Sequence, residues 1–314
     1  MSTKHQLPSA QAPKIQLRMN WNALETYAIV AGCSILFCSK GVFIKSAYQL
    51  GADPISLLNL RMAYALPFFV VAGWWSSRGK PGLNRRQWVA TIWLGFVGYY
   101  LSAVVNFAGL QFISVGLERM VLYSYPSLVL IGSAIFLRKR VRPMTVVAML
   151  IAYLGIVVAF CGEASGGDDL SATLTGVGLV FTSAVTYAIF VLGSGRVIGE
   201  LGAMRFTAYV VGISCLFVLV HYLIQGAVVG NAPSPGAVHM RAIILAIFGT
   251  VLPSFLLGLG LKRAGAQRFA IIGTVGPLAT IALAWLVLGE TMNPLQIFGF
   301  LLTMAGGLLV SLWK

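Results

Sequence analysis

Two stretches of this chain share one spacing of prolines: residues 126–143 read PSLVLIGSAIFLRKRVRP, and residues 277–294 read PLATIALAWLVLGETMNP. A shift of 151 residues aligns them without a gap, and the same shift places Gly155 on Gly306. The loop before the second proline is strongly basic in the first copy and contains no base in the second. Because basic loops favour one side of a membrane, the pattern predicts two copies of one unit in opposite orientations.

The composition is that of an integral membrane protein. Apolar residues make up 58% of the 314 positions, charged residues make up 10%, and the mean hydropathy is +0.88. Soluble domains carry roughly 25% charged residues. The formal net charge of +14 does not indicate a nucleic-acid partner, because bases that flank membrane spans are an insertion signal. The cysteines and histidines lack the spacing of a metal site, so we expect no metal and no cofactor.

The apolar runs predict an all-α fold with ten transmembrane helices, since a span needs about 20 largely apolar residues. A turn-forming cluster at 231–236 divides one of the longer uncharged runs. The expected spans are residues 27–46, 55–77, 88–112, 118–137, 144–162, 172–195, 204–227, 240–261, 269–289 and 295–313.

The basic residues set the expected orientation. With the N-terminus in the cytoplasm, 17 of the 22 lysines and arginines fall on the cytoplasmic side, and six of the eight acids fall outside. This distribution predicts a multi-pass protein of the inner (plasma) membrane with both termini in the cytoplasm. Ten spans divide into two five-helix inverted repeats, because an odd number of spans reverses the second copy. The expected units are a cytoplasmic tail at 1–26, a first repeat at 27–163, an outward loop at 164–171 and a second repeat at 172–314.

Two function classes lack their signature residues. The chain contains no glycine-rich loop followed by Lys-Ser or Lys-Thr, which argues against an ATPase motor. A membrane-embedded enzyme needs a nucleophile–base pair or a metal cluster at membrane depth, and we expect no acid deep in any span. We therefore expect a transport protein rather than an enzyme. The same expected absence argues against a proton antiporter that depends on a buried carboxylate.

Residues in both halves match the pattern of one protein family. They are Pro277, Leu288-Gly289-Glu290, Gln296, Gly299 and Gly306 in the second half, and Lys45, Pro54, Arg61 and Pro126 in the first. With these residues the chain resembles the EamA-type permeases of the drug/metabolite transporter superfamily from about residue 28 onward. The resemblance implies alternating access around a midplane site. Such permeases carry amino acids, other metabolites or drugs, so the resemblance leaves the substrate open.

Lys40 departs from the family pattern, which more often has a neutral polar residue there. It lies about 12 residues into the first expected span, where a cation is costly unless it is paired or hydrated. Either the side chain reaches the outer interface near Lys45, or it lines a cavity and binds an anionic group. Arg138-Lys139 also departs, replacing the Gly-Glu of the motif with what we interpret as a topology signal.

Arg61 lies inside the second expected span, and we expect it to form a structural ion pair. Its candidate partners are Glu118, Asp53 and Glu290, which we place near the outer surface.

Polar side chains at helical spacing mark candidate cavity faces. They serve either the substrate or hydrogen bonds between helices. Pro126 and Pro277 hold equivalent places in the fourth and ninth spans, where each is either a hinge or a packing kink. The candidate cavity residues besides Lys40 are Tyr99, Ser102, Asn106, Tyr123, Ser127, Ser183, Tyr187, Thr250, Ser254 and Thr274.

Small residues form a stripe on the fifth span, at Ala148, Ala152 and Gly155, and on the tenth, at Gly299 and Gly306. Such stripes pack helices closely, either within the chain or between the protomers of a homodimer.

Taken together, the sequence predicts a permease that exports a small metabolite, with a carboxylate-bearing substrate such as an amino acid favoured by a cationic, tyrosine-rich cavity. The alternative is a multidrug or nucleoside-like exporter.

Overall fold

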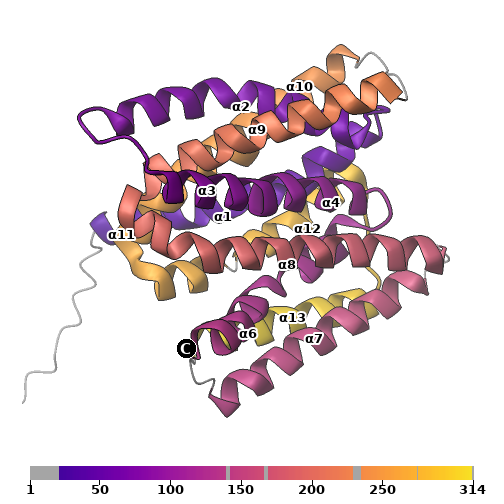
Figure 1. Cartoon of the computed structure of the whole chain (residues 1–314). Coiled ribbons are helices and arrows are strands. Elements are labelled where there is room, and N and C mark those ends of the chain that lie inside the picture. The colour runs from indigo at the N-terminus through magenta and orange to yellow at the C-terminus, as the bar shows by residue number, and fades with distance from the viewer. Residues whose placement is uncertain (1–20, 139–141, 166–168, 229–234, 274, 313–314) are drawn as a thin grey trace, which may run out of the picture.

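The chain is a bundle of helices (Figure 1), and the described residues contain no strand. The computed structural model describes residues 21–138, 142–165, 169–228, 235–273 and 275–312. Two short segments, η1 and η2, are π-helical. The elements are α1 (Trp21–Tyr48), α2 (Pro54–Ser77), α3 (Arg85–Leu94), η1 (Gly95–Leu101), α4 (Ser102–Gly109), α5 (Val115–Leu122), α6 (Tyr125–Leu137), α7 (Pro143–Ala164), α8 (Leu170–Leu201), α9 (Ala203–Val228), α10 (Gly236–Ala246), η2 (Ile247–Val251), α11 (Leu252–Gly273), α12 (Val275–Leu288) and α13 (Pro294–Leu312).

The apolar helices bear out an all-α membrane fold. In the described ranges, eight helical stretches are long and apolar enough to cross a membrane. Two further apolar helices, Val275–Leu288 and Pro294–Val310, are shorter and occupy the places of the expected ninth and tenth spans.

One expected loop is helical. The sequence places a connection at 262–268, but α11 runs through it from Leu252 to Gly273. The segment reads KRAGAQR. It contains no proline to end the helix, and its alanines, glutamine, lysine and arginines are strong helix formers. The aligned segment of the first repeat behaves differently, because residues 110–114 leave the helix and form a turn.

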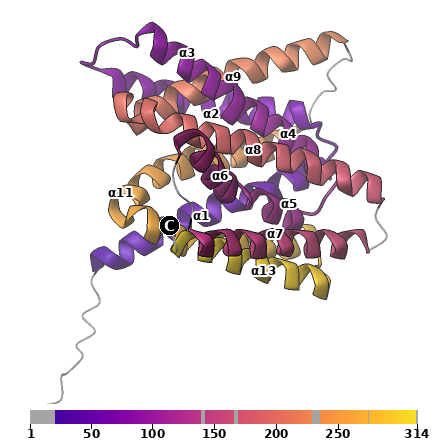
Figure 2. The same ribbon diagram turned by 60° about the horizontal axis from the view of Figure 1, so that its bottom comes forward.

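The connections gather at two opposite ends of the bundle. At one end, Arg205 donates a 2.8 Å hydrogen bond to the carbonyl of Pro81. At the other end, Nζ of Lys45 lies 2.8 Å from Oε1 of Glu290. α1 begins and α13 ends at the same end, on the left in both views (Figures 1 and 2). The segregation of basic and acidic loops expected from the sequence therefore corresponds to two physical ends of the bundle.

α7 and α13 hold equivalent places in the two repeats, and they pack side by side along their length (Figure 1). A β-carbon on Gly155 would lie 2.5 Å from the amide nitrogen of Thr303, and one on Gly306 would lie 2.5 Å from that of Ala152. The 151-residue shift converts each contact into the other. Farther along, Gly162 meets the beginning of α13. Late residues of one helix thus meet early residues of its partner, so the two equivalent helices are antiparallel and the repeats are inverted.

The halves are interleaved rather than stacked. α2 of the first half packs on α9 of the second, α1 packs on α11 and α12, and α8 packs on α4 and α6. The largest buried apolar cluster draws residues from α1, α2, α4, α9 and α10. The small-residue stripes of α7 and α13 therefore serve close packing within the chain, and they are not free to supply a dimer interface.

The π-helical segments occur at matching positions. η1 contains Gly98 and η2 contains Gly249, which the repeat shift superimposes. Gly98 packs against the ring of Phe190 in α8, and a β-carbon on Gly249 would lie 3.4 Å from Cβ of Lys40 in α1. Each π-helical segment thus packs on the first helix of the other half. Such π-helical turns are found frequently at functional sites. The region around Lys40, which packs on η2, is therefore a candidate functional site.

Candidate functional site

Lys40 is half-buried beside η2 in the interior of the bundle. Among the described residues its amine has no hydrogen-bond or ion-pair partner. It lies within electrostatic range of Arg119, Glu118 and Arg61. Lys45, five residues farther along α1, is by contrast tied at the end of the bundle to Glu290 and to the carbonyl of Ile113.

The expected ion pair of Arg61 is wrong for the residues that the structure describes. Arg61 is 7% exposed, and its Nε donates a 2.8 Å hydrogen bond to Oγ1 of Thr250. Its guanidinium carbon lies 5.5 Å from the ring centre of Phe107, a cation–π arrangement. A hydroxyl and an aromatic face thus replace the expected carboxylate, and Arg61 keeps an uncompensated positive charge in the interior.

The expectation that no acid lies deep in a span is not contradicted, because Glu118 lies in the first turn of α5, but this acid is buried within the protein rather than exposed at the outer surface. Glu118 belongs to α5, in the first part of the fourth span, and is 0% exposed. Its Oε2 lies 2.8 Å from Nε of Arg119, and its Oε1 accepts a 2.8 Å hydrogen bond from Nδ2 of Asn106. A β-carbon on Gly41 of α1 would lie 3.4 Å from Oε2 of Glu118. The carboxylate thus faces the helix that carries Lys40, because the turn at 110–114 and the cap at Ser114 begin α5 against α1.

The charges of this region do not balance. Lys40, Arg61 and Arg119 are cations, and Glu118 is the acid among them. Taking a cation out of water is costly without a counter-ion, so an excess of buried cations favours the entry of an anionic group.

Several of the remaining candidates satisfy one another across helices. Ser102 of α4 and Ser183 of α8 have their hydroxyl oxygens 2.9 Å apart, and each also donates to the other's carbonyl. Ser254 donates to the carbonyl of Thr250 in its own helix. These contacts are the interhelical and local hydrogen bonds that were the alternative to substrate binding, and they place Ser102 and Ser183 in the α4–α8 contact.

The tyrosines lie in aromatic clusters around the same interior. Tyr99 packs edge-on against Phe190 at 5.2 Å between ring centres, and Tyr187 packs edge-on against Tyr125 at 5.3 Å. Tyr123 lies against Gly307 of α13. Ser127 contacts Tyr153 of α7. Thr274 lies outside the described residues.

The two prolines lie near the beginnings of α6 and α12. α5 ends at Leu122, and α6 begins at Tyr125 with Pro126 in its first turn. α11 ends at Gly273, and Pro277 lies near the beginning of α12. The break before Pro126 fits the expectation of a bend there, while a hinge role of either proline stays a prediction.

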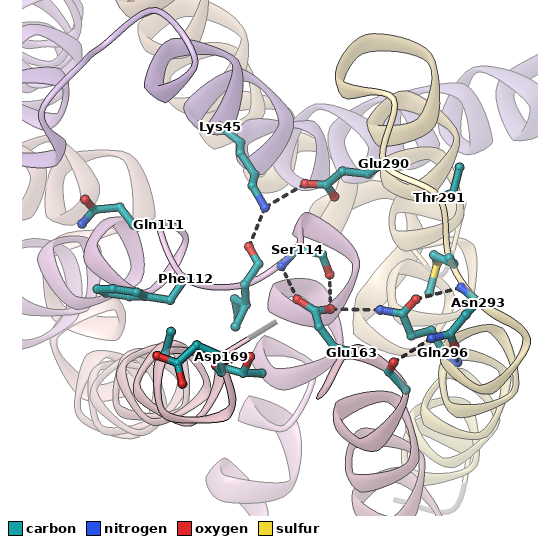
Figure 3. A pocket seen from close by; sticks show the side chains of 15 residues that line it. Lys45, Gln111, Phe112, Ser114, Glu163, Asp169, Glu290, Thr291, Asn293 and Gln296 are labelled. Atoms are coloured by element: carbon teal, nitrogen blue, oxygen red, sulfur yellow. Dashed lines mark hydrogen bonds and ion pairs between the residues drawn. The ribbon is translucent and has the colours of Figure 1, made fainter. Parts of the chain in front are cut away.

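A cavity of about 700 Å³ opens at the end of the bundle where Lys45 meets Glu290 (Figure 3). Two carboxylates of its wall hold the beginning of α5: Glu163 accepts from the amide and hydroxyl of Ser114, and Glu290 accepts from the amide of Val115 at 3.0 Å. The described candidate residues lie outside its wall. The lining residues are Lys45, Gln111, Phe112, Ile113, Ser114, Gly162, Glu163, Asp169, Ala172, Thr173, Glu290, Thr291, Met292, Asn293 and Gln296.

These contacts join the ends of α1, α7, α12 and α13 to one short segment, Ile113–Val115, at which α5 begins (Figure 3). Lys45 of α1 and Glu290 after α12 bind its two ends, Glu163 of α7 binds its middle, and Gln296 of α13 donates a 3.0 Å hydrogen bond to Glu163. One wall of the cavity is therefore a network of hydrogen-bonded and ion-paired side chains. The described residues contain no group of three or more side chains placed to hold a metal ion.

Comparisons with known proteins identify the family. The model of the EamA-like transporter family matches residues 25–161 and again residues 174–312. The chain belongs to this family. The uncharacterized transporter YcbK of Bacillus subtilis (strain 168) is 29% identical over 270 residues, covering 85% of this chain and 86% of YcbK. The uncharacterized transporter YyaM of the same organism is 23% identical over 292 residues, covering 92% and 94%.

A solved crystal structure shares the fold. It matches with a TM-score of 0.64 and 18% identity, over 92% of this chain and 97% of that one. The family match and these relatives establish the EamA chain as a transporter-family membrane protein, in agreement with the resemblance seen in the sequence.

Sequence reasoning missed Glu118 and Arg119 as interior residues and assigned them to the outer side. The signal was present: the pair is preceded and followed by apolar residues, Leu117 and Met120, inside an expected helix. Adjacent opposite charges at the edge of a span suggest interfacial residues, and only the packing of α5 against α1 and α4 reveals the burial.

Proposed function

We propose that this EamA-family protein is a secondary transporter that moves a small anionic metabolite, probed first as a carboxylate, by alternating access and without chemical conversion of its cargo. The observation that carries the proposal is the excess of cations over acids in the interior, with Lys40 left without a partner among the described residues. In a region of low dielectric constant, a carboxylate and a lysine attract each other more strongly than in water.

The inverted repeats support the alternating-access part of the proposal. Two equivalent halves around a shared centre can exchange conformations and open the centre to either side in turn. The polar contacts around Ile113–Val115 hold one end together, so we assign this arrangement to a state closed at that end. With the basic loops inside, that end faces outward and both termini are cytoplasmic.

Aromatic rings add a preference within the class. Tyr99 lies within electrostatic range of Arg61, and Phe190 and Tyr187 pack beside it in one aromatic cluster. A substrate with an apolar or aromatic body and one carboxylate matches both features. A cationic drug would meet like charges at Lys40 and Arg61, which disfavours that alternative.

The deciding experiment is uptake by purified protein in liposomes. Metabolites are offered in four pools: anionic, zwitterionic, neutral and cationic. We expect transport of the pools whose members carry a carboxylate. Transport confined to the neutral or cationic pool would refute the anionic assignment and favour the nucleoside-like or multidrug alternative.

Lys40→Met tests the residue that carries the proposal, since it keeps the length of the side chain and removes the charge. Loss of a buried charge partner costs several kcal/mol, or about a hundredfold in affinity. Lys80→Met is the matched control, because Lys80 is an exposed lysine outside the helices. An affinity change of less than about threefold for Lys40→Met, in protein of normal thermal stability, would remove Lys40 from the site.

A further inference from the structure

Three buried polar atoms around Arg119 lack hydrogen-bond partners among the described residues: Oδ1 of Asn106, Oε2 of Glu118 and Nε of Arg119. The three residues are 2%, 0% and 8% exposed in that order. Buried polar groups in native proteins are nearly always hydrogen-bonded, and each exception calls for an explanation. Nε of Arg119 and Oε2 of Glu118 lie 2.8 Å apart as an ion pair, so Oδ1 of Asn106 is the acceptor left without a partner. A buried acceptor without a donor beside an ion pair is a place that a proton-bearing group can fill.

The existing ion pair has a geometry that is easy to exchange. Neighbouring residues on a helix do not face each other, so the carboxylate of Glu118 reaches Arg119 from the side. Nε lies 2.8 Å from Oε2 but off the hydrogen-bond line. The hydrogen bond from Nη2 to Oε1 is long, at 3.2 Å. An external carboxylate can instead meet the planar guanidinium face-on with two parallel hydrogen bonds, which is the stronger arrangement.

We infer that Glu118 is an internal placeholder for the anionic group of the substrate. In the empty protein it pairs with Arg119. When a substrate carboxylate binds between Arg119 and Lys40, it displaces Glu118, and Glu118 takes up one proton. The inference rests on the proposed function and deepens it, because it couples each bound anion to one proton.

The proton follows from the burial of Glu118. A displaced carboxylate without exposure to water would keep its charge with no partner, at high cost. Once protonated, its O–H can donate to Oδ1 of Asn106, which lacks a donor in the empty protein. One O–H bond forms, the proton comes from water on the side of substrate entry, and no covalent bond breaks in protein or substrate. One ionised carboxylate replaces another, so the net charge of the region stays constant.

The neighbouring elements supply few competing sites for the proton. On α1, Lys40 and Cys38 face the pair, and Arg61 of α2 lies within electrostatic range of Lys40. The sequences of α4, α12 and α13 contain no titratable side chain. On α7, Glu163 is bound into the wall of the outer cavity, and on α8, Tyr187 packs against the aromatic cluster. Among these groups Glu118 is the one that loses its ion-pair partner when a substrate carboxylate binds to Arg119, so we assign the proton to it.

Benzoate is the probe, and benzamide, which has the same shape without the charge, is its control. Apparent affinity is measured on the purified full-length protein in detergent, from ligand-dependent thermal stabilisation between about pH 6 and about pH 8. For the wild type we expect affinity for benzoate to rise as the pH falls, by up to about tenfold per pH unit, since one proton binds with each anion. Benzamide should show no such dependence.

Glu118→Gln removes both the charge and the proton site. We expect this variant to bind benzoate about tenfold or more tightly at neutral pH and to lose the pH dependence. Glu118→Asp should retain the dependence. Glu200→Gln is the matched control, because Glu200 is an exposed acid paired with Arg196 at the far end of α8.

The direction of the change separates a placeholder from a structural partner. If Glu118 serves only to hold Arg119, Glu118→Gln binds benzoate less tightly or equally, and the inference is overturned. Wild-type binding of benzoate without pH dependence overturns it as well, while leaving the proposed anionic substrate intact. Absence of benzoate binding in both proteins, together with uptake of only neutral or cationic compounds in liposomes, would overturn the proposed function itself.

Discussion

Nε of Arg61 lies 2.8 Å from Oγ1 of Thr250, so the π-helical segment of the second repeat holds a buried cation of the first. The same hydroxyl donates to the carbonyl of Leu245, five residues earlier in the chain, at 3.2 Å. The Thr250 hydroxyl thus accepts a hydrogen bond from Arg61 in the first half of the molecule and donates one to Leu245 in the second half. This bond exists only while α2 and η2 keep their present positions.

Thr250→Val keeps the shape of the side chain and removes the acceptor. We expect it to lower the free energy of unfolding by about 1–3 kcal/mol, because Nε of Arg61 is left buried without a partner. Thr250→Ser retains the hydroxyl and serves as the control. Thermal unfolding in detergent measures both variants, and equal unfolding temperatures for the two would show that the bond contributes nothing to stability.

Gly155→Ala and Gly306→Ala should destabilise the protein to a similar extent. Each new β-carbon would lie 2.5 Å from a backbone nitrogen of the facing helix, and overpacking of this kind costs about 1–3 kcal/mol. Gly178→Ala in α8 is the control, since its β-carbon would meet open space. Unfolding temperatures decide the matter; a strong effect at one glycine and none at the other would contradict the equivalence of the two helices.

Lys45→Met and Glu290→Gln should each loosen the closed end of the bundle. The pair is 25% and 20% exposed, and such a bridge contributes about 1 kcal/mol, or roughly fivefold in the population of an opened state. The measurement is the rate at which Cys38 reacts with a water-soluble maleimide, after Cys33, Cys161 and Cys215 are replaced by alanine. The double variant should react no faster than either single one, and unchanged rates would refute a closing role.

Cysteine labelling also tests the orientation of the repeats in a membrane. Arg142 and Thr291 are exposed residues in the two aligned loops. In intact cells, a cysteine at position 291 should react with an impermeant reagent from outside, and a cysteine at position 142 should react only after the membrane is opened. Labelling of both from the same side would contradict the inverted topology.

The repeat and the helical class could be predicted from the sequence because they depend on periodicity and composition, whereas for Lys40 the sequence left an interior and an interfacial place open. Pro126 marked the break between α5 and α6 for the same reason, since proline acts on its own helix. The helicity of residues 262–268 was missed because clustered charges in a membrane protein suggest a loop, although the same residues are good helix formers.

The partners of Arg61 and the burial of Glu118 could not be predicted in this way. Both depend on how helices are rotated against each other, which a single sequence does not specify. Arg61 binds a hydroxyl and a ring rather than a carboxylate, and Glu118 packs against Gly41 of α1.

The reciprocal contact of Gly155 and Gly306 makes the α7–α13 interface isologous: the same patch, used twice, meets itself through an approximate two-fold axis. Interfaces of that kind hold separate molecules together in symmetric dimers, so the peptide between α7 and α8 is not what keeps the two halves in register. A gene split after residue 165 should therefore yield two fragments that find each other in the membrane. In this respect the two halves of the chain behave like the two subunits of a dimer that are joined by a linker.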